Sequence, residues 1–199
     1  MTTRSAIDKL LPRLLRGRLK APASLLLLLC ALLVGAGSLS TAHAAPAASP
    51  EYQVKAAFLY NFMKFVEWPG DPAGTPGTIS LGILGHDPFG DALDAVRGKY
   101  AKGRRVVVVH FRSLEEVKGC DLLFVCASEK GRLSQTLKLA NNSRMLTVAD
   151  QDGFCEAGGM INLVFVKNRV GFEVNVAAAN RAKLRISSQL LKLARHVFE

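Results

Sequence analysis

The sequence predicts a single three-layer α/β domain: a mostly parallel, mixed sheet flanked by helices, with a β-hairpin and a closing helix at the C-terminus. Runs of strand type alternate with helical patterns, which requires crossover connections and favours parallel strands covered on both faces. The last two strand-like runs are separated only by Lys167-Asn168-Arg169, so they are expected to pair antiparallel. The sheet should therefore be mixed.

The first 44 residues have the pattern of a secretory signal peptide and are excluded from the fold. A basic stretch is followed by the apolar run ASLLLLLCALLVGAGSL and by Ala42-His43-Ala44. The apolar run from Ala21 to Leu39 is 19 residues long, close to the length of a membrane span, so an uncleaved anchor is the alternative. The small residues favour cleavage after Ala44, with residues 45–50 as a flexible leader and residues 51–199 as the domain. N-terminal sequencing that found an intact Met1 would exclude cleavage.

Cleavage changes the charge of the protein. The chain has 26 basic and 16 acidic residues, and removing the six basic and one acidic residue of the first 44 leaves 20 and 15, a net charge of +5. The remaining 155 residues suffice for one domain with a substantial core. Because half of the net positive charge is lost and the chain is expected to be exported, no nucleic-acid partner is expected.

The segment after the leader predicts an amphipathic helix over Val54–Trp68, ended by Pro69-Gly70. Its apolar face comprises Val54, Phe58, Leu59, Phe62, Phe65 and Val66. Lys55 falls inside this apolar arc, so its side chain either extends outward along the sheet or meets an acid such as Glu51.

Strands and helices then alternate to the C-terminus, after a Pro- and Gly-rich loop over Asp71–Gly77. The predicted strands are Ile79–Leu84, Arg105–Phe111, Asp121–Cys126, Arg144–Ala149, Met160–Val166 and Val170–Asn175. The predicted helices are Phe89–Arg97, Leu114–Val117, Ser128–Asn141 and Ala177–Phe198, the last with Leu184, Leu191, Ala194 and Phe198 as its core stripe. Asn168 is expected to take a left-handed turn position in the hairpin.

Three cysteines follow the cleavage site. Cys120 and Cys126 would lie at opposite ends of one strand, about 20 Å apart, which is too far for a disulfide. Cys126 and Cys155 follow consecutive strands at the same end of the sheet, so we expect them to form a disulfide in an oxidising compartment and Cys120 to be a buried free thiol. Three reduced thiols are the alternative, since nothing in the sequence proves that the two strands are neighbours.

The loops that follow the strands carry the candidate ligand-binding residues His86, Asp87, Ser128 and Asp150. Ser128, His86 and Asp150 could be written as a catalytic triad, but Ser128 lacks the G-x-S-x-G elbow. The run Asp150–Gly153 resembles the start of a calcium loop and lacks its distal Glu. No metal spacing and no nucleotide-binding glycine motif occurs, so neither a cofactor nor a metal nor an enzymatic activity is expected.

Five segments together resemble the YfiR (YfiR/HmsC-like) family. They are VKAAFLYNFMKFVEWP (54–69), ISLGILGHDPFG (79–90), GCDLLFVCASE (119–129), LTVADQDGFCEAGGMINLVFVKNRVGFEVN (146–175) and AAANRAKLRISSQLLKLAR (177–195). In order, they cover nearly the whole mature domain. The resemblance implies a periplasmic regulator rather than an enzyme. Such a regulator binds the periplasmic sensor domain of an inner-membrane diguanylate cyclase (YfiN-like) and lowers cyclic-di-GMP signalling and biofilm formation.

The resemblance also implies a homodimer, a YfiB-like outer-membrane lipoprotein that sequesters the regulator, and sensitivity to the disulfide state. Here Gly82 stands where a partner for Cys120 would be expected, and Cys126 replaces a small polar residue. The redox arrangement is therefore expected to differ.

Cyclase contact is assigned by this resemblance to the block Gly158–Arg185. The candidate partner-binding residues are Phe172, Glu173, Asn175 and Arg185, with Tyr60 and Met63 at the edge of the apolar face of the first helix. The alternatives are that Phe172 is core and that Arg185 pairs with Glu173. A competing function is a periplasmic small-ligand carrier or sensor that uses the loops around His86 and Asp150.

Overall fold

The computed structural model describes residues 49–68, 77–117, 119–141 and 143–199, which lie within one compact unit, Ala44–Glu199. The expected signal peptide, residues 45–48 of the leader, the Pro69-Gly70 helix stop and residues 71–76 of the predicted loop lie outside the described residues. Within the described ranges, no helix has the length and apolar character needed to span a membrane.

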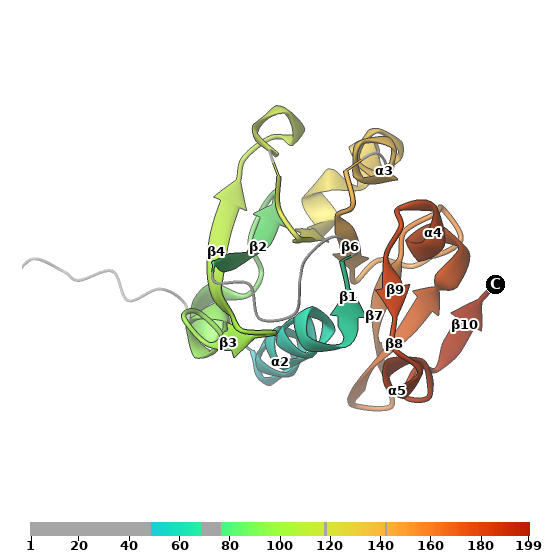
Figure 1. Cartoon of the computed structure of the whole chain (residues 1–199). Coiled ribbons are helices and arrows are strands. Elements are labelled where there is room, and N and C mark those ends of the chain that lie inside the picture. Colours follow the sequence, from blue (N-terminus) through green and yellow to red (C-terminus); the bar gives the residue numbers. More distant parts are fainter. Residues whose placement is uncertain (1–48, 69–76, 118, 142) are drawn as a thin grey trace, which may run out of the picture. The chain divides into compact units, whose positions relative to one another are not determined.

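An eight-stranded mixed sheet forms the centre of this unit in the part of the chain that is described, in the order β10-β8-β7-β6-β5-β2-β4-β3 (Figure 1). The strands are β2 (Thr78–Leu84), β3 (Tyr100–Ala101), β4 (Arg104–Phe111), β5 (Leu122–Val125), β6 (Leu146–Ala149), β7 (Ile161–Val166), β8 (Arg169–Asn175) and β10 (His196–Phe198). The five central strands, β4, β2, β5, β6 and β7 in sheet order, are parallel. At one edge β3 pairs antiparallel with β4, and at the other β8 pairs antiparallel with β7 and parallel with β10. The predicted fold class and all six predicted strands are confirmed.

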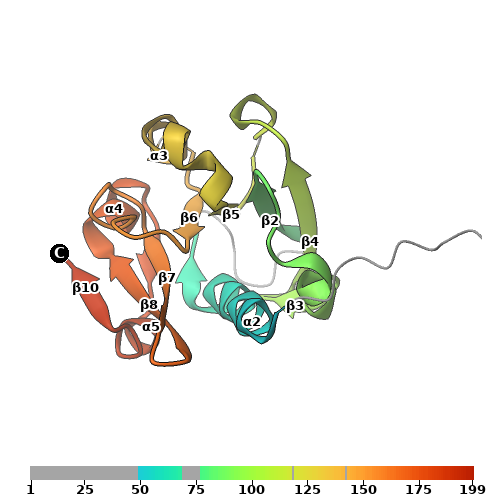
Figure 2. The same cartoon turned by 180° about the vertical axis from the view of Figure 1, so that it is seen from behind.

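Helices cover both faces of the sheet, which gives the three expected layers. Helix α2 (Pro50–Phe65) packs on one face and α3 (Leu133–Asn141) on the other (Figures 1 and 2). The larger core lies under α2 and includes Phe62, Phe124 and Phe172, and the second core lies under α3. The short helices η1 (Gly90–Ala95), η2 (Leu114–Glu116) and η3 (Ala127–Arg132) are of the 3₁₀ type.

Helix α2 begins and ends at different residues from those predicted. Ser49 caps it, since the Ser49 hydroxyl accepts a hydrogen bond from the Tyr52 amide at 3.5 Å, and Pro50 occupies the first turn. The helix ends at Phe65 because Val66–Glu67 form a short strand, β1, paired antiparallel with β9 (Arg185–Ile186).

The hairpin between β7 and β8 turns on two residues. Lys167 and Asn168 have φ values of 51° and 60°, the left-handed pair that matches the twist of a tight hairpin. The predicted left-handed position of Asn168 is therefore confirmed.

The prediction of one closing helix over Ala177–Phe198 is wrong. The segment forms α4 (Val176–Arg181), β9, α5 (Ser188–Leu191) and β10. Helix α4 stops because Lys183 takes φ 61° and the Leu184 amide donates to the Ala179 carbonyl at 2.9 Å, as in a Schellman motif. After α4, β9 pairs with β1 in the small sheet and β10 pairs with β8 in the large one. Of the predicted core stripe only Leu184 is buried, whereas Leu191, Ala194 and Phe198 are half-buried.

Candidate functional site

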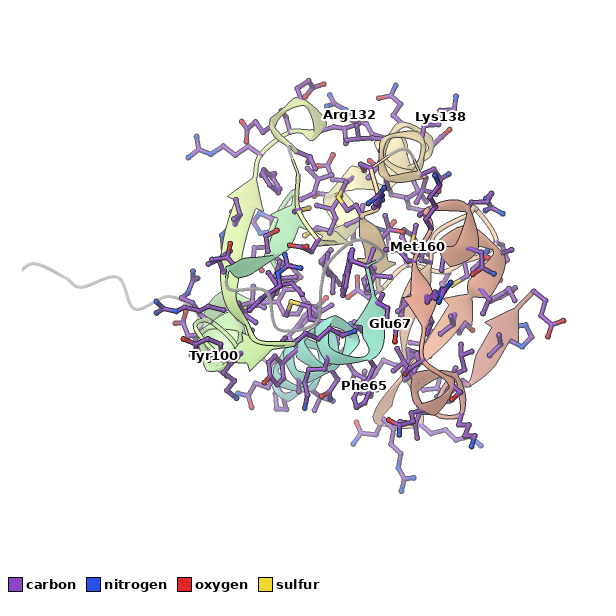
Figure 3. The ribbon with its side chains drawn as sticks, viewed as in Figure 1. Phe65, Glu67, Tyr100, Arg132, Lys138 and Met160 are labelled. Atoms are coloured by element: carbon purple, nitrogen blue, oxygen red, sulfur yellow. The ribbon has the colours of Figure 1, made fainter. Side chains whose placement is uncertain are left out.

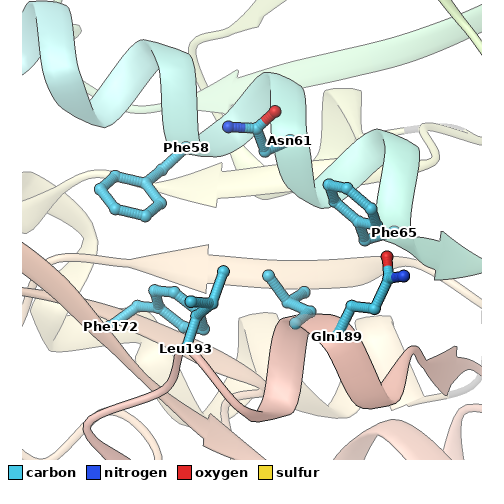
Figure 4. Close-up of a pocket in the computed structure, with 7 residues that line it drawn as sticks. Phe58, Asn61, Phe65, Phe172, Gln189 and Leu193 are labelled. Atoms are coloured by element: carbon cyan, nitrogen blue, oxygen red, sulfur yellow. The ribbon is translucent and has the colours of Figure 1, made fainter.

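An apolar groove lies between α2, β8 and α5 (Figure 4). Its volume is about 110 Å³, similar to that of one large apolar side chain. The residues that line it are Phe58, Asn61 and Phe65 of α2, Phe172 of β8, Gln189 and Leu190 of α5, and Leu193. The groove is therefore built from segments that are far apart in the sequence.

The spacing of residues along α2 explains how one wall of the groove forms. Positions 58, 61 and 65 are three and four residues apart, so they share one side of the helix, next to the fully buried face that includes Leu59 and Phe62. Phe172 forms the floor: its ring lies 5.6 Å from that of Phe58 and 5.2 Å from that of Phe62, both edge-to-face.

The other wall is held in place by hydrogen bonds at the start of α5. The Ser187 amide donates to the Phe65 carbonyl at 3.1 Å, which ties α5 to the end of α2. The Ser187 hydroxyl accepts from the Leu190 amide at 3.3 Å and so caps α5. Leu193 stands at the rim with 71% of its surface exposed, the highest value among the exposed large hydrophobic residues of the described chain.

Only one of the predicted partner-binding residues, Phe172, lines this groove. Tyr60 is half-buried on α2, and its hydroxyl donates to the Tyr100 carbonyl at 2.9 Å. Met63, which the helical projection places at the edge of the apolar face, is completely buried in the core, so the buried face of α2 extends one position further than that projection indicates.

The remaining candidates of the C-terminal block have other neighbours. Glu173 accepts a hydrogen bond from the Asn162 side chain at 3.3 Å, and Arg185 is exposed on β9, opposite Glu67. The Asn175 side chain caps α4 through the Ala178 amide, at 2.7 Å, which is a structural role. Sequence reasoning missed Asn61, Gln189 and Leu193. The one signal in the sequence was that Leu193 is an apolar residue that does not belong to the predicted core stripe of the last helix.

Three of the four predicted ligand-loop residues meet at the carboxyl ends of β2 and β5. The His86 amide donates to the Ser128 hydroxyl at 2.9 Å, and Asp87 accepts from the Phe89 amide at 2.7 Å. The other carboxylate oxygen of Asp87 lies 2.7 Å from Nε2 of His110, at the end of the neighbouring strand β4. This cluster is polar and partly exposed.

Asp150 belongs instead to a buried charge cluster that joins the start of α2 to the end of β6. Lys55 Nζ lies 2.6 Å from Asp150 and 2.5 Å from Glu51, and the Tyr52 hydroxyl donates to Asp150 at 2.8 Å. Burial, followed by the hydrogen bond to Asp150, raises the pKa of Tyr52 well above its usual value. Lys55 thus meets acids rather than extending outward, and Asp150 is not available to a triad with Ser128.

All three cysteines of the described chain are free, so the expected Cys126–Cys155 disulfide is absent from this structure. Strands β5 and β6 are neighbours, as the expectation required. However, Cys155 lies six residues beyond β6, where its carbonyl accepts from the Asn175 side chain at 2.8 Å, on the β8 side of the molecule. Cys126 lies at the end of β5 and packs in the core under α2.

Cys120 is a buried free thiol, as predicted. Its sulfur lies 3.1 Å from that of Met145, and a Cβ on Gly82 would lie 3.0 Å from it. Burial is the main cause that raises the pKa of each of the three thiols to about 12. Across the described ranges, no group of three His, Cys, Asp or Glu side chains is placed to hold a metal ion.

Comparison with known proteins agrees with the fold and identifies the family. The crystal structure of a conserved domain protein from Vibrio cholerae O1 biovar El Tor, strain N16961, is similar with a TM-score of 0.51 at 12% identity, over 75% of this chain and 60% of that one. The chain thus spans about 60% of that protein's length, and the likeness shows the fold alone. A comparison with curated proteins gave no match. The model of the family described as YfiR/HmsC-like matches residues 52–195. The chain therefore belongs to the YfiR/HmsC-like family.

Proposed function

We propose that this protein is a periplasmic inhibitor that binds the sensor domain of an inner-membrane diguanylate cyclase of the YfiN type. By holding the cyclase inactive, it lowers cyclic-di-GMP and restrains biofilm formation. Family membership supports the regulatory role. The proposal includes a homodimer and release by a YfiB-like outer-membrane lipoprotein, as the resemblance implies.

The observation that carries the proposal is the groove with Leu193 at its rim. A leucine side chain that is 71% exposed leaves apolar surface in water, and its burial by a partner is favourable by about 25 cal/mol per Å². The groove beside it has aromatic walls and can accept one apolar side chain of the partner. A pocket of this kind, filled by one anchor residue, is the usual centre of binding energy in an interface.

Polar groups at the groove can orient a bound segment of the partner through hydrogen bonds. Asn61 and Gln189 line the same groove as the phenylalanines, and their amides can both donate to and accept from the backbone of a bound segment. A partner is therefore expected to insert an apolar side chain and to hydrogen-bond at its edges. The binding residues that we assign are Phe58, Asn61, Phe65, Phe172, Gln189 and Leu193.

The test replaces the rim leucine with a charge. Leu193→Asp should weaken binding of the purified cyclase sensor domain by about 30-fold or more, the loss typical of a buried anchor worth about 2 kcal/mol. It should also raise cyclic-di-GMP in cells toward the level of the gene deletion. The matched control is Leu139→Asp on α3, a leucine that is 37% exposed on the opposite face of the sheet. Normal binding by the Leu193 variant would exclude the groove, and unchanged cyclic-di-GMP after gene deletion, with the cyclase expressed, would exclude the function.

A second candidate function is favoured by the polar cluster at the carboxyl ends of β2, β4 and β5. Asp87, His110 and the Ser128 hydroxyl lie there at a position where α/β sheets commonly bind small molecules. A small anionic or zwitterionic ligand would raise the melting temperature by mass action. A thermal-shift screen in which a compound stabilises the protein but not the Asp87→Asn variant would support this function.

A further inference from the structure

A basic, tyrosine-bearing surface surrounds the free edge of the sheet at β3. The segment Arg97–Arg105, with the sequence RGKYAKGRR, holds five basic residues and no acid. This number equals the whole net positive charge of the chain after residue 44. We define the basic edge as Lys64, Lys99, Lys102 and Arg105, with Tyr60 and Tyr100 between them.

The hairpin that carries most of this surface has a defined backbone. Strands β3 and β4 pair antiparallel, and the two residues that join them, Lys102 and Gly103, have φ values of 52° and 78°, as in a tight two-residue hairpin turn. Ala101 is buried and anchors β3 in the core. The Lys102 side chain is therefore presented at the tip of a rigid hairpin.

Tyr100 points outward beside this turn (Figure 3). It is 66% exposed and lies directly opposite Arg105 in the β3–β4 ladder, so the two side chains share one face of the sheet. An edge strand that served only to prevent aggregation would need its lysines but not an exposed aromatic ring. The tyrosine therefore points to a surface that is covered in use.

Two further ammonium groups are held around Tyr60 of α2. Lys64 Nζ and Lys99 Nζ each lie 5.5 Å from the centre of the Tyr60 ring, a distance at which the ring attracts a cation. Within the part of the chain that the structure describes, no carboxylate lies within ion-pair distance of Lys64, Lys99, Lys102 or Arg105. Their charges are thus available to an external anion.

We propose that the basic edge binds the anionic phospholipid headgroups of the membrane surface. Lysine and arginine near such a surface are attracted to lipid phosphates, and tyrosine prefers the headgroup region. A protein partner is the less favoured occupant, because lysine is depleted in protein interfaces and the basic edge lines neither the α2–α5 groove nor the hollow near Val54 and Phe165. An inhibitor of a membrane enzyme would thereby be held close to its target.

Vesicle flotation tests the proposal with protein purified from the periplasm. We expect it to float with vesicles of phosphatidylglycerol and phosphatidylcholine, not with phosphatidylcholine alone, and to be released by high salt. The triple variant Lys64→Gln, Lys99→Gln, Lys102→Gln should lose on the order of 100-fold in partition onto the anionic vesicles, since each lysine near the surface contributes about a factor of five.

The matched control is Lys130→Gln, Lys138→Gln, Lys183→Gln, three exposed lysines outside the basic edge, one of which has a positive φ as Lys102 does. It should float like the unaltered protein, and both triple variants should keep its melting temperature. Equal losses in the two variants, or no flotation of the unaltered protein, would overturn the proposal. So would normal flotation of the basic-edge variant together with loss of binding to the purified sensor domain, which would assign the surface to a protein partner.

Discussion

Lys55 is a buried cation whose place in the fold depends on two carboxylates. Its side chain is 4% exposed, that of Asp150 is 8% exposed, and Lys55 Nζ also lies 4.3 Å from the centre of the Tyr52 ring. Removing one member of such a cluster leaves an unpaired charge in a medium that solvates it poorly. The cluster is therefore a structural joint between α2 and the end of β6, where sequence reasoning had placed a ligand contact.

Lys55→Met should destabilise the protein by about 3 kcal/mol or more, because it leaves the buried Asp150 carboxylate without its cation. Urea unfolding measures the loss as a lower midpoint with an unchanged slope. Lys64→Met is the control, since Lys64 is exposed on the same helix and should lose less than about 0.5 kcal/mol. A Lys55 variant as stable as this control would contradict the structural role of the Lys55–Asp150 cluster.

The three thiols provide a second prediction for single residues. Their pKa values are raised from 9.0 to about 12 by burial, so the folded state favours the protonated thiol. At neutral pH a thiol reagent should modify Cys120, Cys126 and Cys155 slowly in the native protein and rapidly in guanidinium chloride. Fast labelling of the native protein would contradict the burial.

The same shifts set the direction of a pH dependence. Above pH 9 the unfolded chain loses its thiol protons while the folded chain keeps them until about pH 12. Stability from this source is complete below pH 9 and is lost as the pH rises toward 12. Urea midpoints measured in steps across this range should therefore fall, and replacing Cys120 with Ala should make the fall less steep.

At the scale of elements, the β7–β8 turn requires left-handed backbone at two residues. Asn168, with φ 60°, tolerates this conformation better than a branched residue does. Asn168→Gly should keep or raise the stability, by up to about 1 kcal/mol, whereas Asn168→Val should lose about 1–2 kcal/mol. Thermal unfolding of the two variants measures the difference, and equal melting temperatures would show that the turn relaxes to another type.

The elements that sequence reasoning predicted correctly are those whose pattern is local. The β-branched run of β4 and the hairpin of β7 and β8 carry their own periodicity and turn residues, and both were predicted within one or two residues. The C-terminal segment was not, because its apolar spacing fits a helix. Its structure depends on partners elsewhere: Arg185–Ile186 need β1 and His196–Phe198 need β8. The helix end at Lys183 could not be predicted either, because lysine, unlike glycine or asparagine, does not indicate a left-handed backbone.

The candidate site shows the same limit at the scale of the whole molecule. Phe172 was predicted as a contact residue, but the groove also requires α2 and α5, and α5 forms only because the predicted closing helix is broken. Conversely, Asp150 and His86 both follow strands at the carboxyl edge of the sheet, but Asp150 forms an ion pair with Lys55 of α2 instead of joining His86. Residues of one site can be named from a sequence, whereas the neighbours that complete or occupy it depend on the tertiary packing.

Helix α2 contributes to both proposed contact surfaces, which leads to a prediction about their combination. It gives Phe58, Asn61 and Phe65 to the groove and Tyr60 and Lys64 to the basic edge. If membrane contact acts by raising the local concentration of the inhibitor near its target, the basic-edge triple variant should raise cyclic-di-GMP only in part.

Higher expression should then restore repression by the basic-edge variant, because a larger amount of inhibitor replaces the missing local enrichment. The same increase should not restore repression by Leu193→Asp, because its binding to the sensor domain is itself weaker by about 30-fold or more. Combining both sets of changes should give the cyclic-di-GMP level of Leu193→Asp alone where that level already matches the gene deletion, since no repression is then left to lose. An additive increase in the combined variant, measured at matched protein levels, would instead show that the two surfaces act on the cyclase independently.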